Sequence, residues 1–485
     1  MTSPVAPVTP ELRRSIGVVQ ATAMVAGTII GASIFVQPSV ISAQVPSPGA
    51  VAAVWVVAGA LTLIGALVCA ELASAFPRTG GVYVFLRESY SPALGFLWGW
   101  AMFWSMHSGI IAAIAMVFAT YVAHFVALGT AGVKAVAVAG VLVLSAVNYV
   151  GVRHGSRLQT AFTIGKVLGI VAIIAVGLAA VPAAAAPTAG PTSSPFPPAR
   201  DFALALVAGL FAFGGWHMVT YAAGETLRPE RTIPRALLFG TLLVTACYVA
   251  LNAVYFRVLP LETVVTSQRV AADAAAAAVG PRGAAAVSAL VVFSTFGALS
   301  GIILAGPRVY YSMARDGLLF HWAGAVHPRY QTPHRAIALQ ALWASVLVVT
   351  GTYRALFTRV IYTEWIFFGL MAVGLLLLRR RTAYAPSYRM WGYPVLPVVF
   401  AAVCRPSVIS VRLPLSTTTM PHAAASSSAR FFRASSESFS PPVSRANSPG
   451  CGVRILGPPG AESTSRFADR AFRPSASTII GLARC

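Results

Sequence analysis

The sequence predicts an all-α integral membrane protein that crosses the bilayer many times, and three observations lead to this fold class. First, 57% of the 485 residues are hydrophobic and the mean hydropathy is +0.75. Second, only 10% of the residues are charged, whereas soluble domains carry about 25%. Third, apolar runs of about 20 residues recur along the chain, and helices of that length cross a bilayer with their backbone polar groups satisfied.

Ten apolar runs are long enough to predict membrane spans. The first follows Arg13 and Arg14, is longer than the core of a signal peptide and lacks a convincing cleavage site. We therefore expect it to be retained as a span. The predicted spans are residues 16–40, 50–76, 93–122, 133–150, 158–181, 202–223, 236–258, 284–307, 336–351 and 356–378.

The positive charges predict the orientation of these spans. A cytoplasmic N-terminus puts sixteen arginines in the cytoplasmic loops and seven lysines or arginines in the opposite loops. Positive residues are enriched in cytoplasmic loops, so we expect a multi-pass protein with its N-terminus in the cytoplasm. The Arg-rich, Lys-poor composition and the short loops favour the inner membrane of a bacterial cell.

Composition and motifs exclude several other classes of protein. The net charge is +22, but much of it belongs to the topology signal and no nucleic-acid-binding module accompanies it. The five cysteines form neither a disulfide framework nor a metal-ligand pattern. There is no phosphate-binding glycine loop and no Ser–His or paired-carboxylate arrangement. We therefore expect neither an enzyme nor an ATP-driven pump, and no cofactor or metal.

The first span contains features that weaken a helix near mid-membrane. Gly27 and Gly31 lie there with Thr28 and Ser33, and each glycine costs a helix about 1 kcal/mol relative to alanine. Two interpretations stay open at this point. The glycines could interrupt the helix, or their four-residue spacing could let another helix approach closely.

The sixth span carries a second group of glycines and favours the interruption. Gly209, Gly214 and Gly215 lie within it, five spans after the first group. A repeat with an odd number of spans is inverted in its second copy, so corresponding breaks meet near the bilayer centre. Half-helix ends at such a break favour an ionic substrate, for example a carboxylate at the positive end.

Four ordered motifs resemble the amino acid–polyamine–organocation (APC) transporter superfamily, nearest its L-type amino acid transporter branch. The resemblance covers roughly residues 12–397. The motifs are Gly27-Thr-Ile-Ile-Gly-Ala-Ser-Ile-Phe35, Glu71-Leu-Ala-Ser-Ala-Phe-Pro-Arg-Thr-Gly-Gly-Val-Tyr83, Gly209 to Trp216 continued by Glu225 and Pro229 to Pro234, and Gly306-Pro-Arg-Val-Tyr310 to Arg315-Asp-Gly317.

The resemblance implies a five-plus-five inverted-repeat transporter fold with helices 1 and 6 broken around an amino acid. Backbone around Ile29, Ala32 and Ser33 would hold the α-carboxylate, and carbonyls near Phe211, Ala212 and Phe213 would receive the α-amine. Phe211 matches an aromatic gate, and Gly214 and Trp216 match positions that shape the side-chain pocket. The full implied substrate site is Gly27, Ile29, Gly31, Ala32, Ser33, Phe211, Ala212, Phe213, Gly214 and Trp216.

One departure from the family pattern concerns the end of the first motif. The usual ending is Gly-Ser-Gly, whereas this chain has Gly31-Ala32-Ser33. We therefore expect the substrate carboxylate to be approached differently here.

Lys166 is the clearest charged residue inside a predicted span, where ionisable groups cost about 2.5 to 3.5 kcal/mol. One interpretation is that its long stem carries the ammonium to the interface. In the resembled family, a lysine at this place of the fifth helix can stand in for a sodium ion beside helix 1. That resemblance implies either proton coupling, by loading and release of the lysine proton, or sodium-independent exchange.

Two carboxylates at span ends are gate candidates, Glu71 and Glu225, each with an arginine nearby in sequence, Arg78 and Arg228. The alternative is that they neutralise positive charge at the interface. His107 and His217 are isolated on apolar helices, and we expect packing residues rather than ligands.

The family pattern stops after Cys404. Residues 405–485 contain ten arginines, three acidic residues and no lysine, and no 20-residue apolar stretch. We expect helix 11 to be truncated and helix 12 to be absent, with a tail that is either disordered or the product of a frameshift. The predicted organisation is a cytoplasmic N-terminus (1–15), a ten-helix core (16–378), a loop and partial helix (379–404) and the tail (405–485).

The sequence thus predicts a secondary transporter or exchanger of amino acids, most of all neutral ones, that works by alternating access. A cationic amino acid or polyamine carrier ranks lower because no acidic side chain lies in the broken segments, and a membrane sensor derived from a transporter is a further alternative. The expected partners are the amino acid and the lipid bilayer. No nucleic acid is expected, and no disulfide-linked heavy chain, since residues 123–132 lack cysteine.

Overall fold

The computed structural model describes residues 12–31, 33–123, 125–180, 197–267, 269–351 and 353–404, without the side chains of residues 36, 180 and 353–362. These residues form helices and an isolated β-bridge between Ile16 and Thr226. Labels with η mark a π-helix (η1) and 3-10 helices (η3, η4). The elements are α1 (Val18–Ile29), α2 (Ser33–Gln44), α3 (Pro48–Ala75), α4 (Val82–Ser89), α5 (Pro92–Ala101), η1 (Met102–Met106), α6 (His107–Val122), α7 (Thr130–Val150), α8 (Val152–Ala180), α9 (Ala199–Ala212), η3 (Trp216–Glu225), α10 (Pro229–Val258), α11 (Leu261–Thr266), α12 (Val270–Val279), α13 (Pro281–Ala305), α14 (Pro307–Arg315), η4 (His321–Gly324), α15 (His334–Thr350), α16 (Tyr353–Leu378) and α17 (Val395–Val403).

Seven helical stretches of the described residues are long and apolar enough to cross a membrane. The prediction of a multi-spanning helical membrane protein is therefore confirmed, although fewer helices qualify than the ten predicted spans. The first predicted span is divided into α1 and α2, and α15 has only 17 residues. The qualifying stretches are Pro48–Ala75, Pro92–Val122, Thr130–Val150, Val152–Ala179, Ala199–Glu225, Pro229–Val258 and Pro281–Arg315.

Proline marks the first turn of several helices. Pro48, Pro92, Pro229, Pro281 and Pro307 open α3, α5, α10, α13 and α14. The first N–H groups of a helix have no intrahelical acceptor, so a residue without an N–H costs nothing there. These prolines therefore fit the first turns of the helices that they open.

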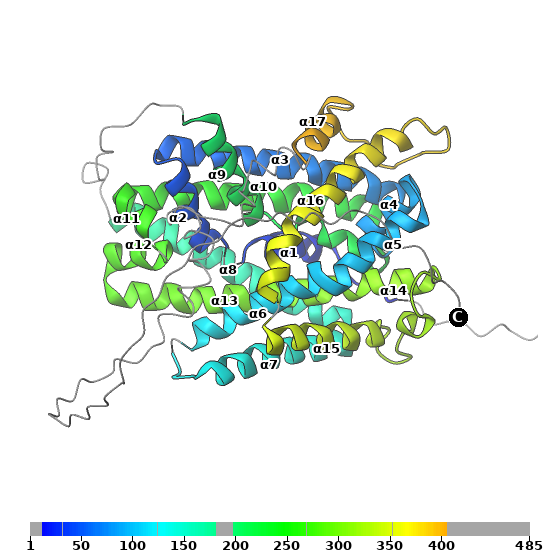
Figure 1. Cartoon of the computed structure of the whole chain (residues 1–485), viewed down its shortest axis with the longest axis horizontal. Helices are drawn as coiled ribbons and strands as arrows, with labels where there is room; N and C mark the ends of the chain where they lie inside the picture. Colours follow the sequence, from blue (N-terminus) through cyan, green and yellow to red (C-terminus); the bar gives the residue numbers. More distant parts are fainter. Residues whose placement is uncertain are drawn as a thin grey trace, which may run out of the picture. The chain divides into compact units, whose positions relative to one another are not determined.

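Small residues let the central helices approach one another. A β-carbon on Gly240 of α10 would lie 2.6 Å from Val25 of α1, and one on Gly297 of α13 would lie 2.6 Å from Phe162 of α8. Such close contacts replace the hydrophobic driving force that helices lack within lipid. α1 consequently packs against α8, α10 and α13 in the interior of the bundle (Figure 1).

The last described helix, α17, has nine residues. It packs against α16 and α3, and a helix of that length is too short to cross a core of about 30 Å. The predicted tail, residues 405–485, lies outside the described residues.

Candidate binding site between the first and sixth spans

The end of α1 leaves backbone carbonyls without helical partners. α1 ends at Ile29, Ile30 has an extended conformation, and α2 begins at Ser33. Ala32, one of the predicted substrate-site residues, lies outside the described residues. The last carbonyls of any helix need other donors. Here those donors are Lys166 of α8, Tyr248 of α10 and Ser294 of α13, whose hydroxyl donates to the Gly31 carbonyl at 3.4 Å.

Lys166 of α8 supplies the strongest of these donors. Its Nζ donates to the carbonyls of Gly27 at 3.0 Å, Ile30 at 2.7 Å and, on α13, Ser294 at 3.1 Å. An ammonium has three N–H donors, so all three are used. The side chain is fully buried, and the ammonium lies at the negative end of the α1 dipole rather than at the interface.

Gly27 lies where α1 touches α8. A β-carbon there would collide with the side chains of Gln159 and Thr163. The Thr163 hydroxyl lies 2.9 Å from the Ala23 carbonyl and 2.8 Å from the Gln159 carbonyl, and donates to one of them at a time. A β-carbon on Gly31, by contrast, would sit at an ordinary 3.7 Å from Ala298. Gly27 therefore serves close helix packing, whereas Gly31 belongs to the non-helical stretch.

The sixth predicted span has a similar junction. α9 ends at Ala212, and η3 begins at Trp216 after Gly215, which has a left-handed conformation with φ 99°. The Thr28 hydroxyl lies 3.1 Å from the Gly215 carbonyl, 2.7 Å from the Met24 carbonyl and 3.1 Å from the Val25 carbonyl, and it donates its proton to one of them at a time. A β-carbon on Gly215 would lie 3.2 Å from Thr28. The two junctions are therefore in direct contact.

Tyr248 of α10 connects both junctions. Its hydroxyl lies 3.2 Å from the carbonyl of Ile29 and 3.2 Å from the carbonyl of Ala212, and it donates its proton to one of them at a time. Its ring packs against Trp55 and Phe213 at centroid distances of 5.3 and 5.1 Å.

The described members of the predicted substrate site lie at the two junctions or in the helices that end and begin there. Gly27, Ile29, Gly31, Ala212, Phe213 and Trp216 are buried, Ser33 and Phe211 are partly buried, and Gly214 is exposed. The ring of Trp216 packs on Phe368 of α16 at 5.1 Å.

Glu225 forms a buried ion pair with Arg308 of α14. Nε of Arg308 lies 2.7 Å and Nη2 3.1 Å from the two carboxylate oxygens, and both side chains are fully buried. The backbone N–H groups of Ser15 and Ile16 donate to the Glu225 carbonyl at 2.8 and 3.0 Å. The partner is therefore not Arg228, which is near Glu225 only in sequence.

Glu71 likewise pairs with a residue far along the chain. Its carboxylate accepts hydrogen bonds from Nε and Nη2 of Arg379 at 2.8 and 2.6 Å, and from the backbone N–H of Met390 at 2.8 Å. The hydrogen-bonded Glu71 carboxylate raises the pKa of Arg379. Arg78, the neighbour considered from sequence, pairs with Glu88 at 2.6 Å.

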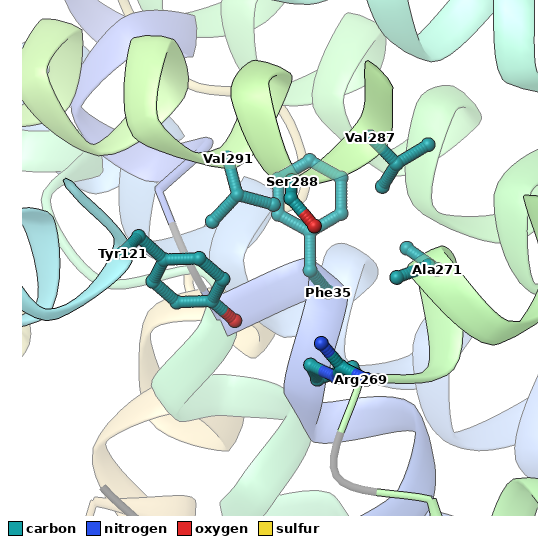
Figure 2. A pocket seen from close by; sticks show the side chains of 8 residues that line it. Phe35, Tyr121, Arg269, Ala271, Val287, Ser288 and Val291 are labelled. Carbon is teal, nitrogen blue, oxygen red and sulfur yellow. The ribbon is translucent and has the colours of Figure 1, made fainter. Parts of the chain in front are cut away.

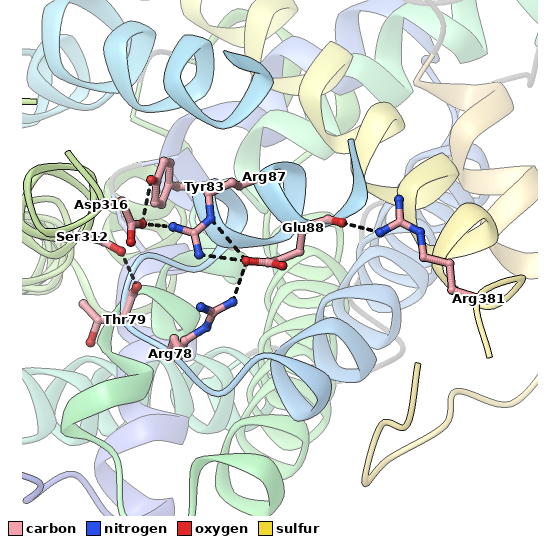
Figure 3. A network of polar contacts seen from close by, with 8 residues as sticks. All are labelled: Arg78, Thr79, Tyr83, Arg87, Glu88, Ser312, Asp316 and Arg381. Atoms are coloured by element: carbon pink, nitrogen blue, oxygen red, sulfur yellow. Dashed lines mark hydrogen bonds and ion pairs between the residues drawn. The ribbon is translucent and has the colours of Figure 1, made fainter. Parts of the chain in front are cut away.

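Figure 3 shows a network of polar contacts that joins α4, α14 and the segment after α16. Arg87 pairs with both Glu88 and Asp316, and the Tyr83 hydroxyl donates to Asp316 at 2.8 Å. Partial burial would raise the pKa of Glu88, but hydrogen bonds from Arg87 and Arg78 outweigh it and lower that pKa. Further contacts are Ser312 Oγ to the Thr79 carbonyl and Arg381 Nη1 to the Glu88 carbonyl.

Sequence reasoning considered Arg78 only as a neighbour of Glu71 and assigned no role to the other network residues, although two quoted motifs contain Thr79, Tyr83 and Asp316. Sequence spacing likewise predicted no partner for Glu364, whose Oε1 lies 3.5 Å from Nε2 of His217. Spacing gave no signal for either, because the partners come from helices far apart in the chain.

A pocket lies elsewhere, between α2, α6, α12 and α13, and contains none of the predicted site residues (Figure 2). The pocket is lined by Phe35, Tyr121, Arg269, Ala271, Ala272, Val287, Ser288 and Val291.

Among the described residues, no group of three or more His, Cys, Asp or Glu side chains could hold a metal ion.

Comparison with known proteins shows to which family the chain belongs. A family model described as amino acid permease matches residues 16–419. The chain is 32% identical over 395 residues to the serine/threonine exchanger SteT of Bacillus subtilis (strain 168), covering 81% of this chain and 89% of that protein. It is 31% identical over 381 residues to the human (Homo sapiens) b(0,+)-type amino acid transporter 1, covering 77% of each.

A third relative is the Asc-type amino acid transporter 1 of Mus musculus, 31% identical over 402 residues, with 81% of this chain and 76% of that protein covered. The family match spans most of the chain, and so do the alignments with these transporters. The protein therefore belongs to the amino acid permease family and is a multi-pass membrane protein.

Proposed function

We propose that this permease is a secondary transporter or exchanger of neutral amino acids that works by alternating access. The observation that carries the proposal is the contact between the two helix junctions, made by the Thr28 hydroxyl and the Gly215 carbonyl at 3.1 Å. The printed names of its relatives, an exchanger of serine and threonine and two amino acid transporters, support the substrate class.

The finer architecture belongs to the same proposal. Spans 1 to 5 and 6 to 10 would form two inverted repeats, with helix 1 broken between α1 and α2 and helix 6 broken between α9 and η3. The element bounds support this, since non-helical backbone inside a membrane is tolerated only where it is buried in protein or lines a cavity.

The substrate would lie between these junctions. Backbone at Ile29, Ala32 and Ser33 would receive its carboxylate, and carbonyls near Phe211, Ala212 and Phe213 its amine, with Gly27, Gly31, Gly214 and Trp216 completing the site. The N-terminal end of a helix favours a carboxylate, and α2 begins at Ser33.

Lys166 would be the coupling residue. Its ammonium contacts two carbonyls of the α1 end and one of α13, so it can supply the positive charge that a bound sodium ion would otherwise supply there. Sodium-independent exchange and coupling through its proton both follow from that role, and the transport assay below separates them.

Glu71 and Glu225 would act as gates. Glu225 joins η3 to α14, and Glu71 joins α3 to the segment after α16. Both pairs would have to separate when the substrate path opens at that end of the bundle, which we propose to be the cytoplasmic end, with the N-terminus on the same side.

Uptake and counterflow in proteoliposomes across the twenty amino acids, with and without proton and sodium gradients, test the proposal. Saturable counterflow of neutral amino acids supports it. Preferential flux of lysine, arginine or polyamines would favour the cationic carrier, and binding without flux would favour a sensor.

A further inference from the structure

His217 is a fully buried histidine whose two ring nitrogens have no hydrogen-bond partner among the described residues. It is the second residue of η3 and directly follows Trp216 of the proposed substrate site. Neutral imidazole has one nitrogen that donates and one that accepts, and each unsatisfied buried polar group costs about 1 to 3 kcal/mol. A packing role alone does not explain a polar ring kept in this state.

Aromatic rings enclose the imidazole. The centroids of Trp98, Trp216, Tyr221 and Phe368 lie 6.1, 5.4, 5.4 and 4.7 Å from that of His217. This enclosure limits water around the ring, so charge on His217 has to be balanced by a nearby protein group.

Glu364 of α16 is the group in that position. Its Oε1 lies 3.5 Å from Nε2 of His217, and its side chain is 12% exposed. The separation is longer than a normal hydrogen bond of 2.7 to 3.2 Å. A small rotation of either side chain would let a proton bridge the two atoms.

The other ionisable groups around the pair do not supply a counter-charge. His107 of α6 faces His217 but is bonded through Nε2 to the Ile302 carbonyl at 2.7 Å. Tyr221 packs on His217 and interacts electrostatically with Glu364, with Cys69 of α3 and with Tyr310 of α14. Glu225, at the far end of η3, is already paired with Arg308.

Charge balance then determines what the pair holds. Neutral imidazole beside an ionised carboxylate is a buried anion. One added proton makes the pair neutral overall, either as imidazole and carboxylic acid or as imidazolium and carboxylate. A second added proton makes it a buried cation, and both the anion and the cation are costly inside a membrane. The single proton belongs to the pair rather than to either residue.

We propose that His217 and Glu364 form a proton-binding site, and that proton release accompanies movement of η3 against α16. The inference rests on the proposed transport function and deepens it, since the site adjoins Trp216. The proton comes from water on one side and returns to water when the pair separates, and no other bond forms or breaks. Amino acid movement would thereby be coupled to proton movement.

Accumulation of labelled neutral amino acid in proteoliposomes under an inward proton gradient tests the coupling. Glu364→Gln and His217→Gln should each reduce the ratio of gradient-driven accumulation to counterflow by at least about tenfold, because an amide binds no proton in this pH range. The matched control is His107→Gln, a second buried histidine, which should leave that ratio as in the wild type. A wild-type ratio in Glu364→Gln overturns the proposal.

Infrared difference spectra between two pH values, recorded on the protein in lipid, test proton binding without transport. One carboxyl band of the wild type and of His107→Gln should be missing from Glu364→Gln, whereas the bands of the other acidic residues remain. Identical bands in Glu364→Gln overturn the proposal. Counterflow that a proton gradient does not affect would overturn only this inference. The absence of counterflow with every amino acid would overturn the transport function, and the infrared result would then decide whether the pair binds a proton.

Discussion

Individual side chains replace the helical hydrogen bonds that the junctions lose. Lys166, Tyr248 and Thr28 each reach a backbone carbonyl at the end of α1 or beside η3. Lys166 was identifiable from sequence because a charge inside an apolar run is rare. Tyr248 was not, because a tyrosine on an amphipathic surface carries no such signal and its partners become clear only in three dimensions.

Lys166→Met should abolish or uncouple transport. The substitution removes a charge and leaves the carbonyls of Gly27 and Ile30 without a donor. A hydrogen bond to a charged group contributes about 1.5 to 3 kcal/mol, so counterflow should fall at least about tenfold. Gel filtration of the detergent-solubilised variant would show that it still inserts and folds.

The matched control is Lys134→Met on α7, whose exposed ammonium donates to the Val349 carbonyl at 2.8 Å. It should transport like the wild type. Wild-type flux through Lys166→Met would contradict the coupling role.

Tyr248→Phe should weaken substrate binding moderately. The ring packing on Trp55 and Phe213 is kept, and only the hydroxyl shared by the two junctions is lost, at a cost of about 0.5 to 1.5 kcal/mol. The half-saturation concentration for counterflow should rise by a few-fold, up to about tenfold.

Tyr255→Phe, on the same helix, is the control, because the buried hydroxyl of Tyr255 has no hydrogen-bond partner in the part of the chain that the structure describes. An equal effect in both variants would show that Tyr248 acts only through general packing.

Whole helices are joined by ion pairs between elements that are distant in sequence. Glu225 connects η3 to α14 through Arg308, and Glu71 connects α3 to Arg379 beyond α16. Sequence identified the carboxylates but suggested the wrong arginines. Sequence reasoning considers the nearest arginine along the chain as the partner of each carboxylate. The chain turns after α3, however, and Arg78 pairs with Glu88 instead.

Arg308→Met should destabilise the folded protein strongly, because it leaves the Glu225 carboxylate buried without a partner. Removing one member of a buried pair costs about 3 to 5 kcal/mol, whereas replacing both members by apolar groups is often neutral. The double variant Glu225→Leu with Arg308→Met should therefore recover much of the loss. Thermal unfolding in detergent, followed by gel filtration, measures both.

Arg14→Met, at an exposed position, is the control and should unfold like the wild type. A double variant no more stable than the single one would show that Arg308 stabilises the fold by other contacts.

At the scale of the whole molecule, the polar network in Figure 3 joins the first and second halves of the chain. Glu88 has a lowered pKa in the folded protein. Its carboxylate therefore stabilises the fold fully above its ordinary pKa of 4.5, and this contribution is lost as the pH falls through the lowered value.

Glu88→Gln should accordingly unfold at a lower temperature than the wild type at neutral pH, and the difference should narrow as the pH falls below 4.5. Glu262→Gln, at an exposed position of α11, should show no such trend. A difference between Glu88→Gln and the wild type that stays constant through this acid range would contradict the contribution of the ionised carboxylate.

The sequence by itself determined the membrane class, most of the long helices and the two glycine-containing segments. The length of an apolar run predicts a membrane-spanning helix, and glycines within such a run weaken the helix; both properties can be read from a single segment of the chain. Only the tertiary structure decided which groups meet: Lys166 with the end of α1, Tyr248 with both junctions, Arg308 with Glu225, and His217 with Glu364. Each of these contacts joins residues on different spans, and their distances depend on how all the helices pack. Hydrophobic periodicity records which face of a helix is buried, but not which partner that face meets.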